Sequence, residues 1–419
     1  MTEPRELREQ LVTELRASGA LNDDRVAAAL ADVPRHQFLP GVELGRAYAD
    51  DAIVTKVDAD GRPISSSSQP AIMALMLEQL GVQPGHRVLE IGAGTGYNAA
   101  LLAHLTGDAG QVTTLDLDDD IVAAAREHLA ASGFGGVRVV QADGGNGWPP
   151  GAPYDRVILT VGAWDIAPAW VRQLSPHGRL VLPLALRAGI QYSIAFEQAA
   201  DHLESVSVLP CGFMRLRGAF AGPETVVPVG SRTGILAESD PRPAGAEDLE
   251  SLLAQPGRAI STGIRVTFMD LYGGLGLWLA AREPELGRLS AFGAASPGPG
   301  DPEPATARAR QPGMGMVAGA HGCAALAPMT DPGGTGRAGL RTSFEIGACP
   351  FGTEGTQLAA RLAGHVRDWD AAGRPSLAGL RVSAYPAGAG PPGAPQVTVI
   401  DKQYTRLVLT WPDAGLSPG

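Results

Sequence analysis

The chain contains 419 residues, and 44% of them are hydrophobic, which is enough to build a folded core. The length exceeds what a single hydrophobic core usually organises, so two domains are expected. Acidic residues outnumber basic ones and give a net charge of −11, which argues against a nucleic-acid-binding surface because such a surface needs clustered positive charge.

The cysteines and the N-terminus indicate the compartment. Cys211, Cys323 and Cys349 are an odd number without CxxC spacing, which indicates neither a disulfide framework nor a structural metal site. The charged segment 1–15 lacks the apolar core of a signal peptide, and no apolar stretch is long enough to span a membrane. These features predict a soluble, cytoplasmic protein with no metal and no nucleic-acid or membrane partner.

The first half of the chain predicts an α/β sheet. Leucines at 7, 11 and 15 and an apolar stripe over 26–33 predict two helices, and a third is predicted over 69–80 with Pro70 in its first turn. Strands predicted at 87–91, 111–116, 137–141, 156–161 and 178–183 then alternate with helices at 97–105 and 120–131. This alternation is typical of a doubly wound, mostly parallel sheet covered on both faces.

The regular alternation of predicted strands and helices ends near Gly222. A helix is predicted at 246–255, a strand at 264–268 and an apolar segment at 271–281. Residues 287–336 are rich in glycine and proline and predict long loops or a flexible insertion. A helical stripe from Leu358 to Trp369 and strands at 397–400 and 406–410 follow. We therefore expect an α/β domain over 1–222 and a second, α+β domain over 223–419.

A glycine-rich turn follows the first strand of the predicted sheet. The segment 88–96 reads VLEIGAGTG, and its glycines at 92, 94 and 96 allow the backbone to approach a ligand closely. The spacing is GxGxG followed by a tyrosine, so the dinucleotide fingerprint GxGxxG is not met. Taken alone, such a turn is also compatible with a tight strand–helix connection that binds nothing.

Three acidic residues at the ends of successive strands favour a ligand. Glu90 suits a ligand that carries an ammonium group and a sulfonium, and it would repel a phosphate. Asp116 is placed to accept both ribose hydroxyls, and Asp143 to reach the amino group of an adenine. Together with the glycine turn, these acids indicate S-adenosyl-L-methionine.

Several ordered motifs in the first 220 residues carry a resemblance to a known family. They are PRHQFLP (34–40), AYAD (47–50), SQP (68–70), VLEIGAGTGYNAA (88–100), DG with GWP (143–149), APYDRVI (152–158) and GRLVLP (178–183). In these motifs the chain resembles the protein-L-isoaspartate O-methyltransferases. The resemblance implies a Rossmann-like class I methyltransferase fold that uses S-adenosyl-L-methionine and releases S-adenosyl-L-homocysteine.

The resemblance also implies roles for individual residues. It implies cofactor contacts by Glu90, Gly92, Ala93, Gly94, Gly96, Asn98, Asp116, Leu117, Asp143 and Gly144. Ser68 matches the serine that touches the substrate carboxyl group and the methyl donor, and Ser66 and Ser67 are grouped with it as catalytic. Ser65, Ala163 and Trp164 are assigned to substrate binding. A serine run is also typical of a flexible polar loop, but its place directly before Gln-Pro favours the catalytic interpretation.

Two segments depart from the family pattern. Residues 65–68 are four serines where the family usually has threonine–isoleucine–serine, so Ser67 occupies a common isoleucine position. Residues 162–165 read GAWD instead of a run of small residues in the substrate loop. Both departures concern substrate recognition and leave the cofactor pocket unchanged.

The chain continues well past residue 220, where repair enzymes of the family end. This extension, the serine run, the Trp164 loop and CGFMRLRG (211–218) resemble the subgroup associated with ribosomally synthesised, post-translationally modified peptides such as lanthipeptides and graspetides. The resemblance implies methylation of an aspartate in a macrocyclised precursor peptide, leading to an aspartimide and then isoaspartate. Repair of isoaspartyl proteins and non-catalytic peptide binding stay open as alternatives.

Overall fold

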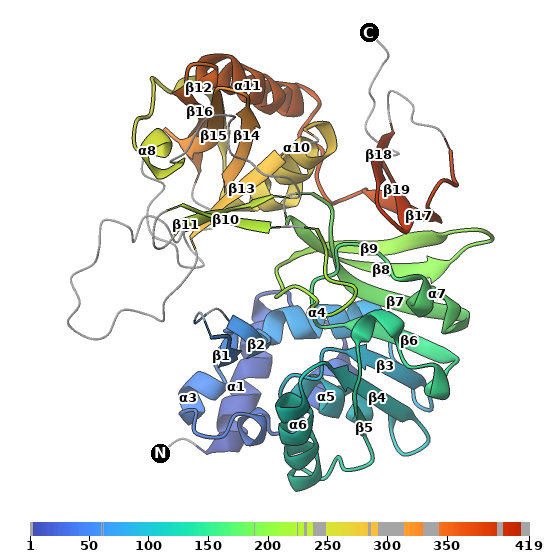
Figure 1. Ribbon diagram of the computed structural model, residues 1–419. Coiled ribbons are helices and arrows are strands. Elements are labelled where there is room, and N and C mark those ends of the chain that lie inside the picture. The colour runs from blue at the N-terminus through green and yellow to red at the C-terminus, as the bar shows by residue number, and fades with distance from the viewer. Residues whose placement is uncertain are drawn as a thin grey trace.

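Two β-sheets organise the chain in the computed structural model (Figure 1). The structure describes residues 3–59, 61, 63–187, 189–223, 225–229, 233–237, 249–283, 286–291, 314–329, 343–391 and 397–411. A ten-stranded sheet is built mainly from residues 87–211, and a seven-stranded sheet from residues 225–352. A separate hairpin pairs β1 (Ile53–Val57) with β2 (Pro63–Ser67).

The centre of the ten-stranded sheet is parallel. In spatial order it contains β5 (Arg138–Gln141), β4 (Gln111–Asp116), β3 (Arg87–Ile91), β6 (Tyr154–Leu159) and β7 (Leu174–Ala185). The chain order reverses between β3 and β6, because β4 and β5 lie on one side of β3 and the later strands on the other. Open α/β sheets bind ligands at such a point, outside the carboxyl ends of the strands. The predicted Rossmann-like α/β fold is confirmed.

Helices cover both faces of this parallel sheet. They are α1 (Pro4–Ala17), α2 (Asp24–Asp32), α3 (Leu44–Ala47), α4 (Pro70–Leu80), α5 (Tyr97–Thr106), α6 (Asp119–Ala131) and α7 (Pro168–Arg172), with the 3-10 turns η1 (Arg35–Phe38), η2 (Gly144–Asn146) and η3 (Pro149–Gly151). Neighbouring residues of a strand point to opposite faces. Accordingly, Val88 packs in the core with the helices α1, α2, α4, α5 and α6, while Leu89 packs in the core that contains Trp170 of α7.

Five antiparallel strands continue the sheet beyond β7. They are β8 (Gln191–Gln198), β9 (Leu203–Cys211), β17 (Arg381–Pro386), β19 (Thr405–Thr410) and β18 (Thr398–Asp401). The predicted strand pair near the C-terminus is confirmed, but it belongs to the first sheet, because β17 pairs with β9. The expected division at residue 222 is therefore wrong for β17–β19. Local periodicity predicts a strand but not its distant partner, so the sequence did not show that the C-terminal strands pair with the first sheet.

The second sheet is antiparallel throughout. Its spatial order is β10 (Thr225–Val229), β11 (Thr233–Ala237), β13 (Leu286–Ala291), β14 (Met314–Gly319), β15 (Gly322–Pro328), β16 (Phe344–Gly352) and β12 (Ile260–Val266). Its helical elements are α8 (Leu249–Leu253), α9 (Phe268–Asp270), the π-helical η4 (Leu271–Leu275), α10 (Gly276–Arg282) and α11 (Gly355–Ala371). The predicted stripe of α11 is buried against this sheet, which confirms the α+β character of the extension.

The predicted loops at 287–336 are wrong where the structure describes them, because residues 314–319 and 322–328 form the hairpin of β14 and β15. A Cβ on Gly319 would lie 2.8 Å from Glu354 Oε2, and one on Gly322 would lie 2.5 Å from the Phe351 carbonyl oxygen. These glycines therefore permit close packing rather than a loop. Residues 292–313 and 330–336 of this stretch, like 246–248 of the predicted helix at 246–255, lie outside the described residues.

One further expectation needs adjustment. The strand predicted at 264–268 begins earlier, at Ile260, and ends at Val266, because Thr267 caps the short helix that starts at Phe268. Within the described parts of the chain, no helix has both the length and the apolar character needed to cross a membrane.

Candidate active site

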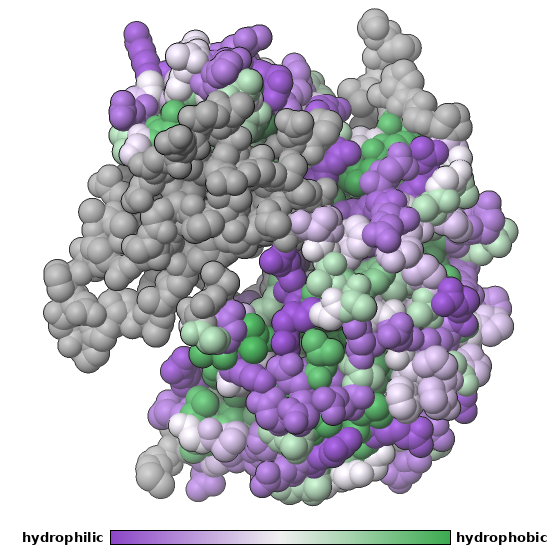
Figure 2. Space-filling model, viewed as in Figure 1, coloured by the Kyte–Doolittle hydropathy of each residue, from purple (hydrophilic) through white to green (hydrophobic). Residues whose placement is uncertain are grey.

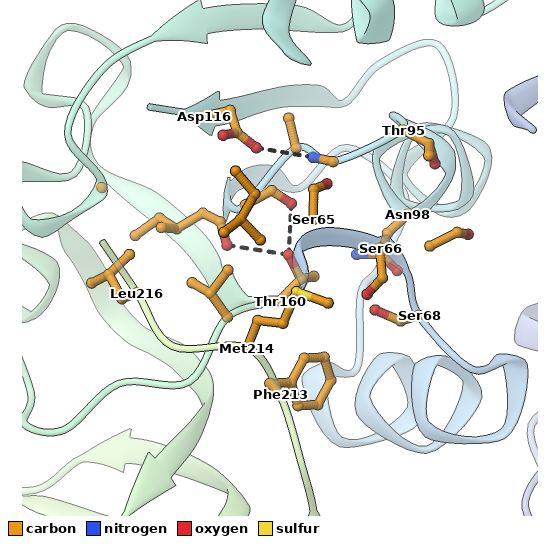
Figure 3. A pocket seen from close by; sticks show the side chains of 18 of the residues that line it. Ser65, Ser66, Ser68, Thr95, Asn98, Asp116, Thr160, Phe213, Met214 and Leu216 are labelled. Atoms are coloured by element: carbon orange, nitrogen blue, oxygen red, sulfur yellow. Dashed lines mark hydrogen bonds between the residues drawn. The ribbon is translucent and has the colours of Figure 1, made fainter. Parts of the chain in front are cut away.

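A pocket of about 360 Å³ lies at the carboxyl ends of β3 and β4. Three segments of the chain enclose it: the serine run at the end of β2, the glycine-rich turn after β3, and residues 210–217, which begin with the last two residues of β9 (Figure 3). Pockets that hold small molecules have volumes of roughly 300–1,000 Å³, so this pocket is large enough for a ligand. It lies at the point of order reversal where the fold is expected to bind one.

The glycine turn is held in an unusual backbone conformation. Gly92, Gly94 and Gly96 have φ angles of 104°, 50° and 88°, in the left-handed region that side chains disfavour. The Gly92 and Ala93 N–H groups donate to the Leu115 carbonyl oxygen at 2.9 and 2.8 Å, which fixes the turn on β4. Gly92, Ala93 and Gly94 line the pocket, whereas Gly96 packs its Cα against α6.

Glu90 is a buried carboxylate beside this turn. Asn98 Nδ2 donates to Glu90 Oε1 at 2.7 Å, and Oε2 has no hydrogen-bond partner among the described residues. Burial raises the pKa of Glu90 to about 7, against the opposing effects of the Thr114 hydroxyl and the Asn98 amide. Asn98 lines the pocket, but Glu90 itself does not. A buried carboxylate with an unpaired oxygen suits a cationic ligand, since a nearby positive charge would favour its ionised form.

Asp116 lines the pocket at the end of β4. Its Oδ2 accepts from the Gly94 N–H at 3.0 Å, and its Oδ1 accepts from the Leu117 N–H at 2.9 Å. Burial raises the pKa of Asp116, and these N–H donors oppose that effect. Because each carboxylate oxygen can accept a second hydrogen bond, Asp116 keeps the capacity to accept ribose hydroxyls. Leu117, next along the chain, also lines the pocket.

Asp143 lies behind the pocket wall. Its Oδ1 accepts from the Gly145 N–H at 2.9 Å and its Oδ2 from the Ala219 N–H at 2.7 Å. Its neighbours Ala142 and Gly144 line the pocket, while Asp143 does not. Asp143 therefore holds Ala219, which follows the pocket-lining residues 210–217, in place. The predicted contact of Asp143 with an adenine stays a prediction.

The serines at 65–68 all line the pocket. Ser66 and Ser67 lie on β2, paired with Val54 and Ile53 of β1, so backbone pairing holds this run in place. The buried Ser67 Oγ has no partner among the described residues. Figure 3 shows Ser66 and Ser68 together with Asn98 at one end of the pocket and Leu216 at the other.

Arg35, a residue that the sequence did not single out as functional, supports the serine run. It is completely buried, and its Nη2 donates to the Ser68 carbonyl oxygen at 2.9 Å. Its Nε donates to the Ala47 carbonyl oxygen at 2.9 Å, and its guanidinium lies 5.2 Å from the ring centroid of Tyr97. The Arg35 side chain thereby connects the serine run to the first residue of α5.

The predicted substrate loop at 162–165 lies outside the pocket. Ala163 is buried and donates its N–H to the Pro183 carbonyl oxygen at 2.8 Å, and neither Ala163 nor Trp164 lines the pocket. Trp164 Nε1 donates to the Phe220 carbonyl oxygen at 2.9 Å. Substrate contact by these two residues stays a prediction.

Several lining residues were not predicted. Thr160 and Val161 follow β6 as the glycine turn follows its neighbour β3, so the rule that pockets form at parallel strand ends would have found them. Thr160 Oγ1 donates to the Gly92 carbonyl oxygen at 2.6 Å. Residues 213–217 belong to the CGFMRLRG motif, but the motif did not predict their place in the pocket, because they reach it only through the antiparallel strands β8 and β9.

A charged cluster beside the pocket connects β1, the start of α6 and the end of the segment 210–217. Lys56 of β1 lies 2.8 Å from Asp118, which is the N-cap residue of α6, and 2.7 Å from Asp120 in the first turn of α6. Arg217 approaches both carboxylate oxygens of Asp118, at 3.1 and 2.9 Å. Arg217 and Lys56 hold the pKa of Asp118 below its usual value.

Comparison with known proteins identifies the family of the catalytic half. A sequence profile of the protein-L-isoaspartate(D-aspartate) O-methyltransferase family matches residues 6–219. The chain belongs to this family. The methyltransferase is 40% identical over 184 residues to the protein-L-isoaspartate O-methyltransferase of Methanopyrus kandleri, which covers 44% of this chain and 79% of the relative. It is 38% identical over 224 residues to that of Methanoculleus marisnigri, covering 54% of this chain and 97% of the relative.

The fold of the methyltransferase also has a counterpart among solved structures. A structure named protein-L-isoaspartate O-methyltransferase covers 90% of this chain and 96% of its own, with 23% sequence identity and a TM-score of 0.50. At this level of identity the likeness supports the fold. The family places the chain among the S-adenosylmethionine-dependent protein carboxyl O-methyltransferases.

The pocket fits S-adenosylmethionine, which supplies an electrophilic methyl group when bound. Gly92 and Gly94 would let the protein backbone approach the ligand closely. Asn98, with the buried Glu90 carboxylate behind it, suits the ammonium group, and Asp116 suits the ribose. The described residues contain no group of three or more histidine, cysteine, aspartate or glutamate side chains placed to hold a metal ion.

Proposed function

We propose that this methyltransferase methylates the side-chain carboxylate of an aspartate in a macrocyclised, ribosomally made precursor peptide. The next backbone amide nitrogen then attacks the ester carbonyl, the C–N bond forms, and the methoxy group leaves as methanol with the amide proton. The product is an aspartimide, and its hydrolysis gives isoaspartate.

This proposal rests on the C-terminal extension and on its pairing with the sheet of the catalytic half. The strands β17–β19 continue the catalytic sheet, which links the extension to the half of the chain that holds the pocket. Tyr404, between β18 and β19, is 37% exposed, and its ring lies 5.4 Å from Phe220 and 6.4 Å from Trp164 of the substrate loop. Exposed aromatic rings are frequent anchors in polypeptide recognition, so this edge suits a peptide larger than one damaged residue.

Apolar surface next to the serine run also favours a polypeptide substrate. Val54 and Val57 of β1 are 48% and 50% exposed, and Val54 is paired with Ser66 of the pocket. Figure 2 shows hydrophobic surface where Figure 1 places β1 and β2. Side chains that flank the acceptor residue of a peptide can bury this surface when the acceptor enters the pocket.

The chemistry requires positioning more than acid–base catalysis. A carboxylate has a pKa near ~4 and is already nucleophilic at neutral pH. The hydroxyl groups of Ser66, Ser67 and Ser68 can donate to one carboxylate oxygen while the other is held in line with the methyl group, which is catalysis by proximity. Cys211 also lines the pocket, but burial raises the pKa of its thiol, so it stays protonated and does not compete as a nucleophile.

Repair of isoaspartyl residues is the second candidate. The relatives from Methanopyrus kandleri and Methanoculleus marisnigri carry the name protein-L-isoaspartate O-methyltransferase, and they match the half that contains the pocket. Non-catalytic peptide binding is the third candidate. The intact glycine turn and the pocket-lining Asp116 and serine run speak against it.

Mass spectrometry separates these candidates. The protein is incubated with S-adenosylmethionine and either a simple isoaspartyl peptide or a cyclised precursor peptide. Maturation predicts a methyl ester on the precursor, followed by loss of methanol to a species one water lighter than the starting peptide. Methylation of the isoaspartyl peptide alone would reject the maturation proposal and support repair.

A further inference from the structure

Asp165 joins the substrate loop to the C-terminal extension. Its side chain is 0% exposed. Its Oδ2 accepts from the Tyr404 N–H at 2.7 Å, and its Oδ1 accepts from Thr405 Oγ1 at 2.5 Å and from the Ile166 N–H at 2.7 Å. Two of these three donors come from the extension, Tyr404 in the turn before β19 and Thr405 at the start of β19, so a buried carboxylate of the catalytic half depends on the extension for its partners.

The other end of the same loop holds the wall of the pocket. The Gly162 N–H donates to the Met214 carbonyl oxygen at 2.7 Å, and the Leu216 N–H donates to the Gly162 carbonyl oxygen at 2.8 Å. Met214 and Leu216 both line the pocket. The four residues 162–165 therefore bond to the pocket wall at one end and to the extension at the other.

An aromatic contact connects the same two parts a second time. Phe220, which follows the pocket wall along the chain, accepts from Trp164 Nε1 through its carbonyl oxygen. Its ring stacks on Tyr404 of the extension with an interplanar angle of 24°. The wall, the loop and the turn at 404–405 thus form one continuous packed unit.

Removal of the donors from the extension would be costly. A buried carboxylate without hydrogen-bond partners is strongly unfavourable, so the loop would have to move to bring Asp165 to water. Because Gly162 is bonded to Met214 and Leu216, such a movement would be passed to the pocket wall. No contact between Asp165 and a ligand is needed for this effect.

We propose that Asp165 is a positioning residue through which the β18–β19 turn of the extension holds the substrate loop and the pocket wall in the conformation that methyl transfer requires. This role goes beyond the proposed function, because it concerns methyl transfer by the family and holds for either acceptor, aspartate or isoaspartate. It gives the extension a part in shaping the active site itself.

A matched pair of variants at Thr405 tests this role. Thr405→Val keeps the shape of the side chain but removes the hydroxyl donor to Asp165, whereas Thr405→Ser keeps the donor. In the full-length protein, backbone amides of residues 211–217 should exchange with deuterium about tenfold faster in Thr405→Val and within about twofold of the unaltered protein in Thr405→Ser.

Methyl transfer supplies the functional readout, using whichever of the two peptides the unaltered protein methylates. The kcat/KM for that peptide should fall about tenfold in Thr405→Val, mainly through KM, and should be retained in Thr405→Ser. In the Asp165→Asn background, Thr405→Val should add less than about a twofold further loss, because the two residues act through one contact. If Asp165→Asn does not fold, the Thr405 pair decides alone.

Equal exchange at 211–217 in the two Thr405 variants would overturn the proposal. So would faster exchange with unchanged kcat/KM, because Asp165 would then serve stability only. If the unaltered protein methylates neither peptide, the proposed function fails, while the exchange comparison still decides whether the extension holds the pocket wall.

Discussion

Replacing Glu90 with glutamine should stabilise the ligand-free methyltransferase and weaken its affinity for S-adenosylmethionine. Glu90 is fully buried, and only Oε1 has a hydrogen-bond partner among the described residues, the Asn98 amide. At neutral pH the folded protein must therefore either bury a negative charge or retain a proton. Glutamine has nearly the same shape, can accept the same bond from Asn98 and carries no charge.

The size of the effect follows from the pKa of Glu90, which burial raises from 4.5 to about 7. A carboxylic acid with a raised pKa is favoured in its protonated form by folding, so the stability of the unaltered protein decreases as the pH rises from about 4.5 to about 7. The shift corresponds to roughly 3 kcal/mol once the group is ionised in both states. Glu90→Gln should thus be more stable by up to about 3 kcal/mol at pH 8 and by less than about 1 kcal/mol at pH 5.

Urea unfolding of both proteins at about pH 5 and pH 8 measures this difference. Glu127→Gln, on the exposed face of α6, is the matched control and should change neither value. Calorimetric titration with S-adenosylmethionine should show an affinity at least about tenfold lower for Glu90→Gln, because the ammonium group loses its carboxylate. Unchanged stability at pH 8 together with unchanged affinity would refute the reasoning.

Four other substitutions test the pocket and the charged cluster beside it. Ser68→Ala should lower kcat at least about tenfold in steady-state kinetics. In calorimetry it should change the dissociation constant of S-adenosylhomocysteine less than about threefold. An unchanged turnover would count against a role of Ser68 in methyl transfer. Gly94→Ala should lower the free energy of unfolding in urea by about 1 kcal/mol, because the φ of Gly94 is 50°. It should also weaken cofactor binding, because Gly94 lines the pocket and the new methyl group would enter it. Normal cofactor binding would contradict the placement of Gly94 at the ligand. Lys56→Met and Arg217→Met should each speed the release of S-adenosylhomocysteine severalfold in stopped-flow measurements and reduce the salt dependence of the release rate. Arg5→Met, at an exposed ion pair on α1, is the control and should do neither. Equal release rates in these three variants would exclude a role for the charged cluster.

The central part of the fold could be predicted because its signals are local. The strands β3 and β4 have the bounds read from their apolar runs, and the glycine turn stands directly between β3 and α5. Consecutive parallel strands bring their carboxyl ends to one edge, so Asp116 and the glycines meet at one pocket.

The rest depends on contacts between distant segments. The carboxylate of Asp143 is bonded to the Ala219 N–H, 76 positions later, which the rule for strand ends does not anticipate. The pairing of β17 with β9 and the contact of Asp165 with Thr405 also join the extension to the catalytic sheet. The glycines of β14 and β15 read as loop formers because sequence periodicity carries no information on how closely α11 approaches them.

Calorimetric titration of the full-length protein with S-adenosylmethionine tests the central claim most directly, since the claim is that the pocket between the serine run, the glycine turn and residues 210–217 holds this cofactor. The account predicts saturable binding near pH 7 with proton release, because a bound cation favours the ionised form of Glu90, and strongly weakened binding in Asp116→Asn. Absence of binding, or binding that Asp116→Asn leaves unchanged, would contradict it.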